Sequence, residues 1–163
     1  MQTVLEPAGF SNTSAAWLVG DLERNPELGR AILEYLGGTA TLRSLDLLRS
    51  TWSSHPTYSS QLYHLDGDAT PQVKVMVFCS DVTMESGPLT VLDADISKRI
   101  QKQLGYKTTR RLTDEQVLPA VGTPLLGPAG TVALVDTSRC FHYGSRVVQG
   151  AERLVAVYQW VRA

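Results

Sequence analysis

The sequence lacks the features that tie a protein to a membrane, to nucleic acid or to a secretory route. No apolar run approaches the ~20 residues needed to cross a bilayer. Residues 1–10 contain neither a basic start nor the long apolar core of a signal peptide. The formal net charge is -1, so no excess of positive charge favours nucleic acid or an anionic lipid surface. We therefore expect a cytoplasmic protein that binds neither of them.

Cysteine is scarce as well. The chain has only Cys79 and Cys140, which are too few for a disulfide framework. Both lie in apolar, strand-like runs, where a free cysteine behaves as a small hydrophobic residue. The sequence therefore predicts two buried free thiols in a reducing compartment.

The composition is that of a folded, soluble protein. The chain has 163 residues, of which 43% are hydrophobic and 19% are charged. This length favours a single domain with one core over residues 1–163. Within it we expect a leading helical segment over residues 1–54 and a β-rich core over residues 55–163.

Two helices and one shorter helical turn can be predicted from local signals. The first helix begins with Asn25 as its cap and Pro26 as its first residue, and it ends at Gly37. A second helix spans residues 95–105, with Asp95 as its cap, and a short turn follows Thr113. The face of the first helix that we expect to be buried consists of Leu28, Ala31, Ile32, Tyr35 and Leu36.

Strand-forming residues dominate the rest of the chain. The predicted strands lie within residues 72–82, 87–93, 130–138 and 153–163, which are rich in valine, threonine and aromatic residues. Residues 42–52 fit a helix and a strand equally well. The pattern favours a mainly β fold, a sandwich or barrel with helices packed on one face.

A histidine and a carboxylate two residues apart give the first chemical signal. If residues 61–66 form a strand, His64 and Asp66 point to the same side of it. His142 is the best candidate for a third ligand, because His55 precedes a proline in a predicted exposed loop. Two histidines and one carboxylate form the facial triad of non-haem Fe(II) oxygenases, which leaves coordination positions open.

Arg153 begins the last predicted strand and shares a face with Val155 and Val157. If this face is buried, the guanidinium needs a partner, since an unpaired buried charge is costly. A 2-oxo acid that chelates the metal would offer its distal carboxylate to such an arginine. The alternative is that Arg153 lies at the strand mouth in water, beside Glu152.

The order of these motifs resembles the phytanoyl-CoA dioxygenase family over residues 55–163. The matching segments are "QLYHLD", "VKVMVFCSDVTMESGPLTVL", "GPAGTVALVDTSRCFHYGSR" and "AERLVAVYQW". The resemblance implies a double-stranded β-helix, a cupin-like jelly roll, with a small N-terminal helical layer. It also implies that O2 and 2-oxoglutarate are used to hydroxylate a small-molecule substrate, with release of succinate and CO2.

The resemblance assigns roles to individual residues. Fe(II) would be held by His64, Asp66 and His142, and 2-oxoglutarate by Arg153, with Gln61 facing the same pocket. Gly144 stands where the family often has a small polar residue that contacts 2-oxoglutarate.

Three further cations are candidates for contacts with the substrate. Lys74 interrupts an apolar run and is a candidate for the pocket rim, while Arg139 and Arg146 flank His142 and are candidates for holding a substrate anion. Asp136 is expected to anchor the turn before His142.

Three other functions remain as alternatives. The first is a jelly-roll protein that binds a metal or a 2-oxo acid without turnover. The second is a halogenase, which Asp66 disfavours because halogenation needs the carboxylate position to be free for chloride. The third is a cupin-like metal enzyme that uses no 2-oxoglutarate, which Arg153 disfavours.

Overall fold

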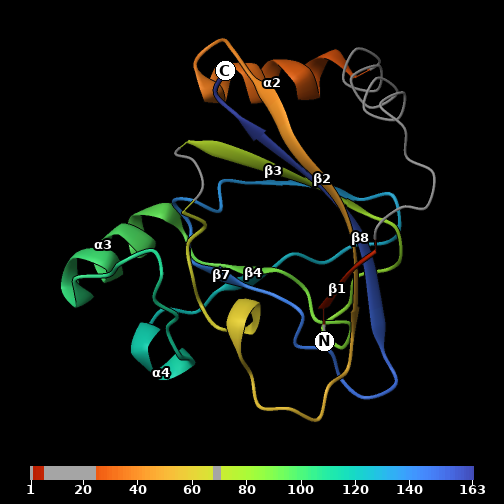
Figure 1. Cartoon of the computed structure of the whole chain (residues 1–163), viewed down its shortest axis with the longest axis vertical. Coiled ribbons are helices and arrows are strands. Elements are labelled where there is room, and N and C mark those ends of the chain that lie inside the picture. Colours follow the sequence, from red (N-terminus) through yellow and green to blue (C-terminus); the bar gives the residue numbers. More distant parts are fainter. Residues whose placement is uncertain (1, 6–24, 68–70) are drawn as a thin grey trace.

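The computed structural model describes residues 2–5, 25–67 and 71–163, and it consists mainly of two antiparallel sheets (Figure 1). The larger sheet has five strands in the order β1-β2-β8-β3-β6. Their bounds are Gln2–Leu5 for β1, Thr41–Thr51 for β2, Glu152–Val161 for β8, Gln72–Phe78 for β3 and Val132–Val135 for β6. The segment 42–52, which fitted helix and strand equally well, is therefore strand β2.

The smaller sheet has three short strands in the order β5-β4-β7. Their bounds are Thr123–Pro124 for β5, Thr90–Val91 for β4 and His142–Tyr143 for β7. Isolated antiparallel bridges extend the pairing, among them Tyr63 with Leu112 and His64 with His142. The two sheets form the double-stranded β-helix that the sequence predicted.

The core between the sheets is built by alternation along β3 and β8. One side of each strand contributes to a buried cluster of Met76, Phe78, Val82, Val155 and Val157. Because successive side chains of a strand point to opposite faces, Val73, Val75 and Trp160 lie on the outer face of the sheet instead.

Helix α2, Pro26–Leu36, covers that outer face, as the N-terminal helical layer was expected to do. The Asn25 side chain accepts a hydrogen bond from the Leu28 amide, and Gly37 ends the helix with a φ of 86°. Ile32 and Leu36 are 1% and 0% exposed and pack on the strands. Ala31 and Tyr35, which were also expected on the buried face, are exposed, because they lie beside the stripe that contacts the sheet. Local capping and one apolar stripe thus explain where this helix starts, ends and docks.

Helices α3, Ala94–Leu104, and α4, Asp114–Val117, lie beside the smaller sheet, away from α2 (Figure 1). They pack around a third cluster, whose buried members are Tyr63, Leu65, Leu92, Ile100, Leu112, Val117 and Phe141. Helix α4 follows its N-cap residue Thr113, where a short helical turn was predicted. The N-cap of α3 is Asp93 rather than the predicted Asp95, so the helix begins two residues earlier than this cap implied.

Further local predictions were wrong. Residues 61–66 do not form a regular strand, because the 3-10 helix η1 occupies Ser59–Gln61 and only single bridges follow it. The two cysteines are not fully buried: Cys79 is exposed just beyond the end of β3, and Cys140 is partly buried. At the end of a strand, an apolar composition no longer determines which way a side chain points.

Within the described residues, no helix has the length and apolar character needed to cross a bilayer.

Candidate metal and cosubstrate site

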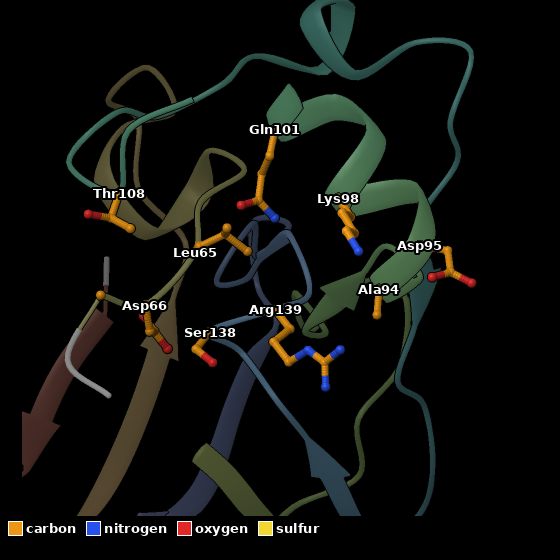
Figure 2. A pocket seen from close by; sticks show the side chains of 10 residues that line it. Leu65, Asp66, Ala94, Asp95, Lys98, Gln101, Thr108, Ser138 and Arg139 are labelled. Atoms are coloured by element: carbon orange, nitrogen blue, oxygen red, sulfur yellow. The ribbon is translucent and has the colours of Figure 1, made fainter. Parts of the chain in front are cut away.

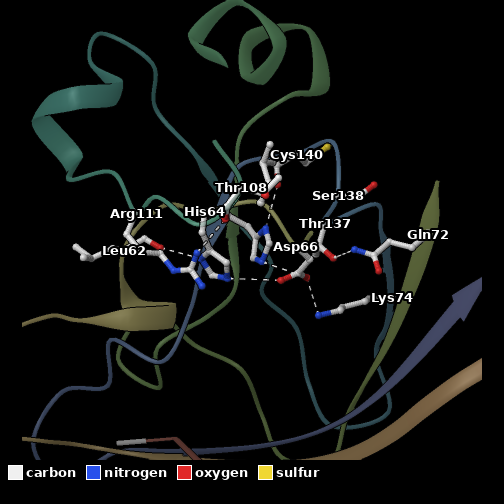
Figure 3. Close-up of polar contacts among 12 residues, drawn as sticks. Leu62, His64, Asp66, Gln72, Lys74, Thr108, Arg111, Thr137, Ser138 and Cys140 are labelled. Carbon is white, nitrogen blue, oxygen red and sulfur yellow. Dashed lines mark hydrogen bonds and ion pairs between the residues drawn. The ribbon is translucent and has the colours of Figure 1, made fainter. Parts of the chain in front are cut away.

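Three predicted ligands meet at one point in the structure. One potential ligand atom each from His64, Asp66 and His142 lies within 4.8 Å of the others (Figure 3). The two histidines are neighbours because their backbones are paired: each amide donates to the other's carbonyl at 3.0 Å. Their ring centroids are 4.2 Å apart. A single β-bridge, rather than the predicted strand, brings the HxD pair to the distal histidine.

Backbone carbonyls fix the orientation of both imidazoles. Nδ1 of His64 lies 2.9 Å from the Leu62 carbonyl oxygen, and Nδ1 of His142 lies 3.0 Å from that of Cys140. A carbonyl can only accept, so Nδ1 carries the proton and Nε2 keeps its lone pair. Each Nε2 lies 3.7 Å from an oxygen of Asp66.

The protonation states suit metal ligation. Burial lowers the pKa of His64, and burial together with the neighbouring His64 lowers the pKa of His142 to about 3. Burial by itself would raise the pKa of Asp66, but His142 and Lys74 lower it to about 2. The set is two neutral imidazoles and one carboxylate, which is the donor set and charge that a divalent iron ion takes in this geometry.

Lys74 lies closer to this cluster than the rim position that the sequence suggested. Its Nζ is 2.7 Å from Oδ2 of Asp66, an oxygen that makes no well-aligned hydrogen bond. The cue was visible in the sequence as one charged residue in an apolar strand. What the sequence did not show is that β3 passes directly beside the HxD segment.

A chain of buried amides approaches Asp66 from the sheet. Gln159 Nε2 donates to Gln72 Oε1, and Gln72 Nε2 donates to Thr137 Oγ1 at 3.1 Å. Gln72 and Thr137 are 0% and 1% exposed, and the Thr137 side chain helps to lower the pKa of Asp66. Sequence reasoning missed all three residues, because a glutamine or threonine in a strand carries no signal of its own.

Arg153 is buried, at 3% exposure, on the inner face of β8. Its Nη2 donates to the hydroxyls of Ser50 and Ser145 at 3.2 and 3.3 Å. Its Nε and Nη1 have no hydrogen-bond partner within the described residues. Burial alone lowers the pKa of this guanidinium to about 10. No carboxylate among the described residues forms an ion pair with it, so within this part of the chain the buried guanidinium has no counter-ion.

The chain segment that follows the predicted metal ligand His142 lies beside the Arg153 guanidinium. Gly144 follows β7 two residues after His142, and a Cβ built on it would lie 3.6 Å from Nη2 of Arg153. The same Cβ would lie 3.6 Å from the Leu89 side chain. A side chain at position 144 would therefore be in van der Waals contact with the guanidinium.

Two of the remaining candidates are engaged by other protein groups. Arg146 makes a two-point ion pair with Asp114, at 2.8 Å for each contact, and stacks over the Tyr143 ring at 3.5 Å. The Gln61 amide donates to the Ser145 carbonyl at 2.9 Å. The contact of Gln61 with a cosubstrate therefore stays a prediction, and so does the role of Arg146 in binding a substrate anion.

Asp136 anchors the turn before His142, as predicted. Its side chain accepts hydrogen bonds from the Ser138 amide and hydroxyl and from the Tyr35 hydroxyl, and its carbonyl accepts from the Cys140 amide.

Arg139 lines a cavity of about 390 Å³ that reaches Asp66 (Figure 2). The cavity lies between helix α3 and the segment around Ser138. Its lining residues are Leu65, Asp66, Gly67, Ala94, Asp95, Lys98, Gln101, Thr108, Ser138 and Arg139.

Comparison with solved structures identifies folds of the same kind. HygX from Streptomyces hygroscopicus with iron bound has a TM-score of 0.62 at 18% identity, covering 99% of this chain and 72% of HygX. A nickel complex of the non-haem monooxygenase ThoJ has a TM-score of 0.54 at 16% identity, covering 84% of this chain and 50% of ThoJ. SnoN, a non-haem α-ketoglutarate-dependent epimerase, has a TM-score of 0.55 at 15% identity, covering 91% of this chain and 59% of SnoN.

No protein-family model matches the sequence, and no curated protein matches it. The structural likenesses therefore show the fold, and membership of the phytanoyl-CoA dioxygenase family stays a prediction. HygX has also been solved with nickel and 2-oxoglutarate, and with hygromycin B in addition.

Proposed function

We propose that this protein is an Fe(II)- and 2-oxoglutarate-dependent dioxygenase that hydroxylates a small organic molecule and releases succinate and CO2. The observation that carries the proposal is the buried Arg153 guanidinium, which has no carboxylate partner within the described residues, together with the cluster of His64, Asp66 and His142. A buried cation without an anion destabilises the fold, so its retention is best explained by an anionic ligand. We also propose that the protein works in the cytoplasm.

The donor set supports iron as the metal. His64, Asp66 and His142 would hold it through Nε2, a carboxylate oxygen and Nε2, because both Nδ1 atoms are engaged by backbone carbonyls. Three protein ligands leave coordination positions for a chelating 2-oxo acid and for O2. When bound, iron and 2-oxoglutarate supply the oxidising chemistry, and the remaining work belongs to the protein.

Arg153 would bind the distal carboxylate of 2-oxoglutarate. Its planar fork matches a carboxylate at two points, and Nε and Nη1 are the donors still without a partner among the described residues. Ser50 and Ser145 accept from Nη2 and so hold the plane of the guanidinium in place. Gly144 has no side chain that would contact the guanidinium in place of the ligand.

The inner faces of the sheets would keep water away from the reaction. Met76, Phe78, Val155 and Val157 are each less than a tenth exposed and form the apolar wall beside Arg153. In a dry interior the ion pair between a guanidinium and a carboxylate is stronger than in water. The same wall limits unproductive side reactions.

The structural neighbours support this class, although they include enzymes with different reactions. HygX binds iron and 2-oxoglutarate, ThoJ is a monooxygenase and SnoN is an epimerase. We propose hydroxylation because Asp66 keeps the carboxylate ligand and no group beyond the metal ligands is needed for it.

The test separates binding from turnover. Fe(II) and 2-oxoglutarate are added without oxygen, and binding is followed by the visible metal-to-ligand absorption band. Oxygen is then admitted and succinate is measured. We expect both signals in the parent protein and neither in Asp66→Ala. A normal band without succinate, with or without added small molecules, would support the non-catalytic alternative instead.

A further inference from the structure

The cavity beside Asp66 has an opening and a set of side chains that the metal and 2-oxoglutarate do not use. Its volume of about 390 Å³ lies at the lower end of the range for small-molecule sites. Asp66 forms part of its wall, whereas Arg153 does not line it. A molecule in this cavity would therefore lie beside the proposed metal ligand Asp66 without contacting Arg153.

Two cations face the cavity from different elements. Figure 2 shows Lys98 and Gln101 reaching from α3 toward the segment that carries Ser138 and Arg139. Arg139 is held by a hydrogen bond from its Nη1 to the Tyr35 hydroxyl at 3.4 Å. A third cation, Arg111, lies beside His64 (Figure 3).

Two carboxylates, Asp66 and Asp95, line the cavity together with Lys98 and Arg139. Asp66 is already paired with Lys74 and is the proposed metal ligand. The Asp95 carboxylate points away from Lys98 in Figure 2. Asp136 accepts hydrogen bonds from Tyr35 and Ser138, and its charge contributes, after the hydrogen bond to Tyr35, to the raised pKa of Arg139.

We propose that this cavity binds the primary substrate, and that the substrate is a hydroxyl-rich small molecule bearing a carboxylate or phosphate. The inference rests on the proposed function, since it names the substrate class of the same site. The anionic group would lie between Lys98 and Arg139. Gln101, Thr108 and Ser138 offer amide and hydroxyl groups to neutral hydroxyls of the substrate.

The experiment uses one sugar skeleton with different charges. Glucose, glucosamine, gluconate and glucose 6-phosphate are titrated into the metal-free protein, and binding is followed by ligand-observed NMR. We expect gluconate or glucose 6-phosphate to bind more tightly than glucose and glucosamine, and more weakly as the salt concentration rises. The two anions distinguish a carboxylate from a phosphate.

Variants locate the binding. Lys98→Gln and Arg139→Gln should each weaken anion binding by roughly fivefold, the upper range for an exposed ion pair. Lys102→Gln is the matched control, since Lys102 lies on the same helix, is exposed and does not line the cavity. Arg153→Met is the second control and should leave anion binding unchanged, because Arg153 does not line the cavity. A loss in this variant would mean that the anion binds at the proposed 2-oxoglutarate position instead.

Three results would overturn the proposal. One is equal binding of all four sugars, or of none. Another is a loss in Lys102→Gln as large as in Lys98→Gln. The third is a loss in Arg153→Met while Lys98→Gln and Arg139→Gln bind normally. The Fe(II) and 2-oxoglutarate titration is run on the same variants. This titration tests the proposed function, and the sugar titration tests the substrate class, so the two can fail independently.

Discussion

The ammonium of Lys74 lies 2.7 Å from Oδ2 of Asp66, so the one carboxylate of the metal-ligand cluster already has a cationic partner. Lys74 lies on β3 of the larger sheet, while Asp66 comes two residues after His64, which forms a β-bridge with His142 on β7 of the smaller sheet. The ion pair therefore joins the two sheets at the proposed metal position. It places a fixed positive charge next to the ion that Asp66 would ligate.

Removing that charge should strengthen metal binding. In Lys74→Met we expect the affinity for a divalent ion to rise by about tenfold, or ~1.4 kcal/mol, because repulsion between two cations is relieved. Lys74→Arg keeps the charge and serves as the control. Titration with Co(II), followed by its visible absorption, measures the change. A weaker affinity in Lys74→Met would show instead that Lys74 mainly positions Asp66.

Arg153 should control cosubstrate binding but not metal binding. Arg153→Lys keeps the charge without the planar fork and should weaken 2-oxoglutarate binding, and Arg153→Met should weaken it further. Losing a hydrogen-bonded charge partner costs about 2–5 kcal/mol, or roughly 30-fold to several thousand-fold in affinity. The anaerobic titration of the Fe(II) form measures both variants. If Arg153→Met binds 2-oxoglutarate like the parent, the cosubstrate assignment loses its main support.

The buried amide pair should behave as a unit. Gln72→Leu leaves the Gln159 amide without its buried acceptor, which should cost about 1–3 kcal/mol of unfolding free energy. The double variant Gln72→Leu with Gln159→Leu removes both partners and should cost less than the sum of the single changes. Urea unfolding of the four proteins completes the cycle. Additive losses would mean that the two amides contribute independently.

Helix α2 should contribute strongly to stability through one face only. Ile32→Ala empties a position that is 1% exposed and should cost about 2–5 kcal/mol. Leu33→Ala is the matched control on the next residue, which is 43% exposed, and it should change stability by less than about 0.5 kcal/mol. Thermal and urea unfolding measure both. Equal losses at the two positions would contradict the packing of α2 on β3.

The sequence by itself determined the local features of this protein. Asn25, Pro26 and Gly37 set the ends of α2, because capping involves neighbouring residues only. Alternation along β8 predicted that Arg153 shares the inner face with Val155 and Val157, since side-chain direction in a strand follows from its period of two. Spacing and the choice of histidine also predicted that His64, Asp66 and His142 would meet.

Tertiary structure alone decided which distant groups neutralise or orient the site. Lys74 reaches Asp66, and Gln159 and Gln72 form a chain to Thr137, because β3 lies between β8 and β6. These contacts depend on strand order and register across long sequence separations, which no local pattern encodes. The same register places Arg153 against two serine hydroxyls and against no carboxylate within the described residues. The missing counter-ion can be recognised only from the folded structure, because the neighbours of Arg153 come from distant parts of the chain.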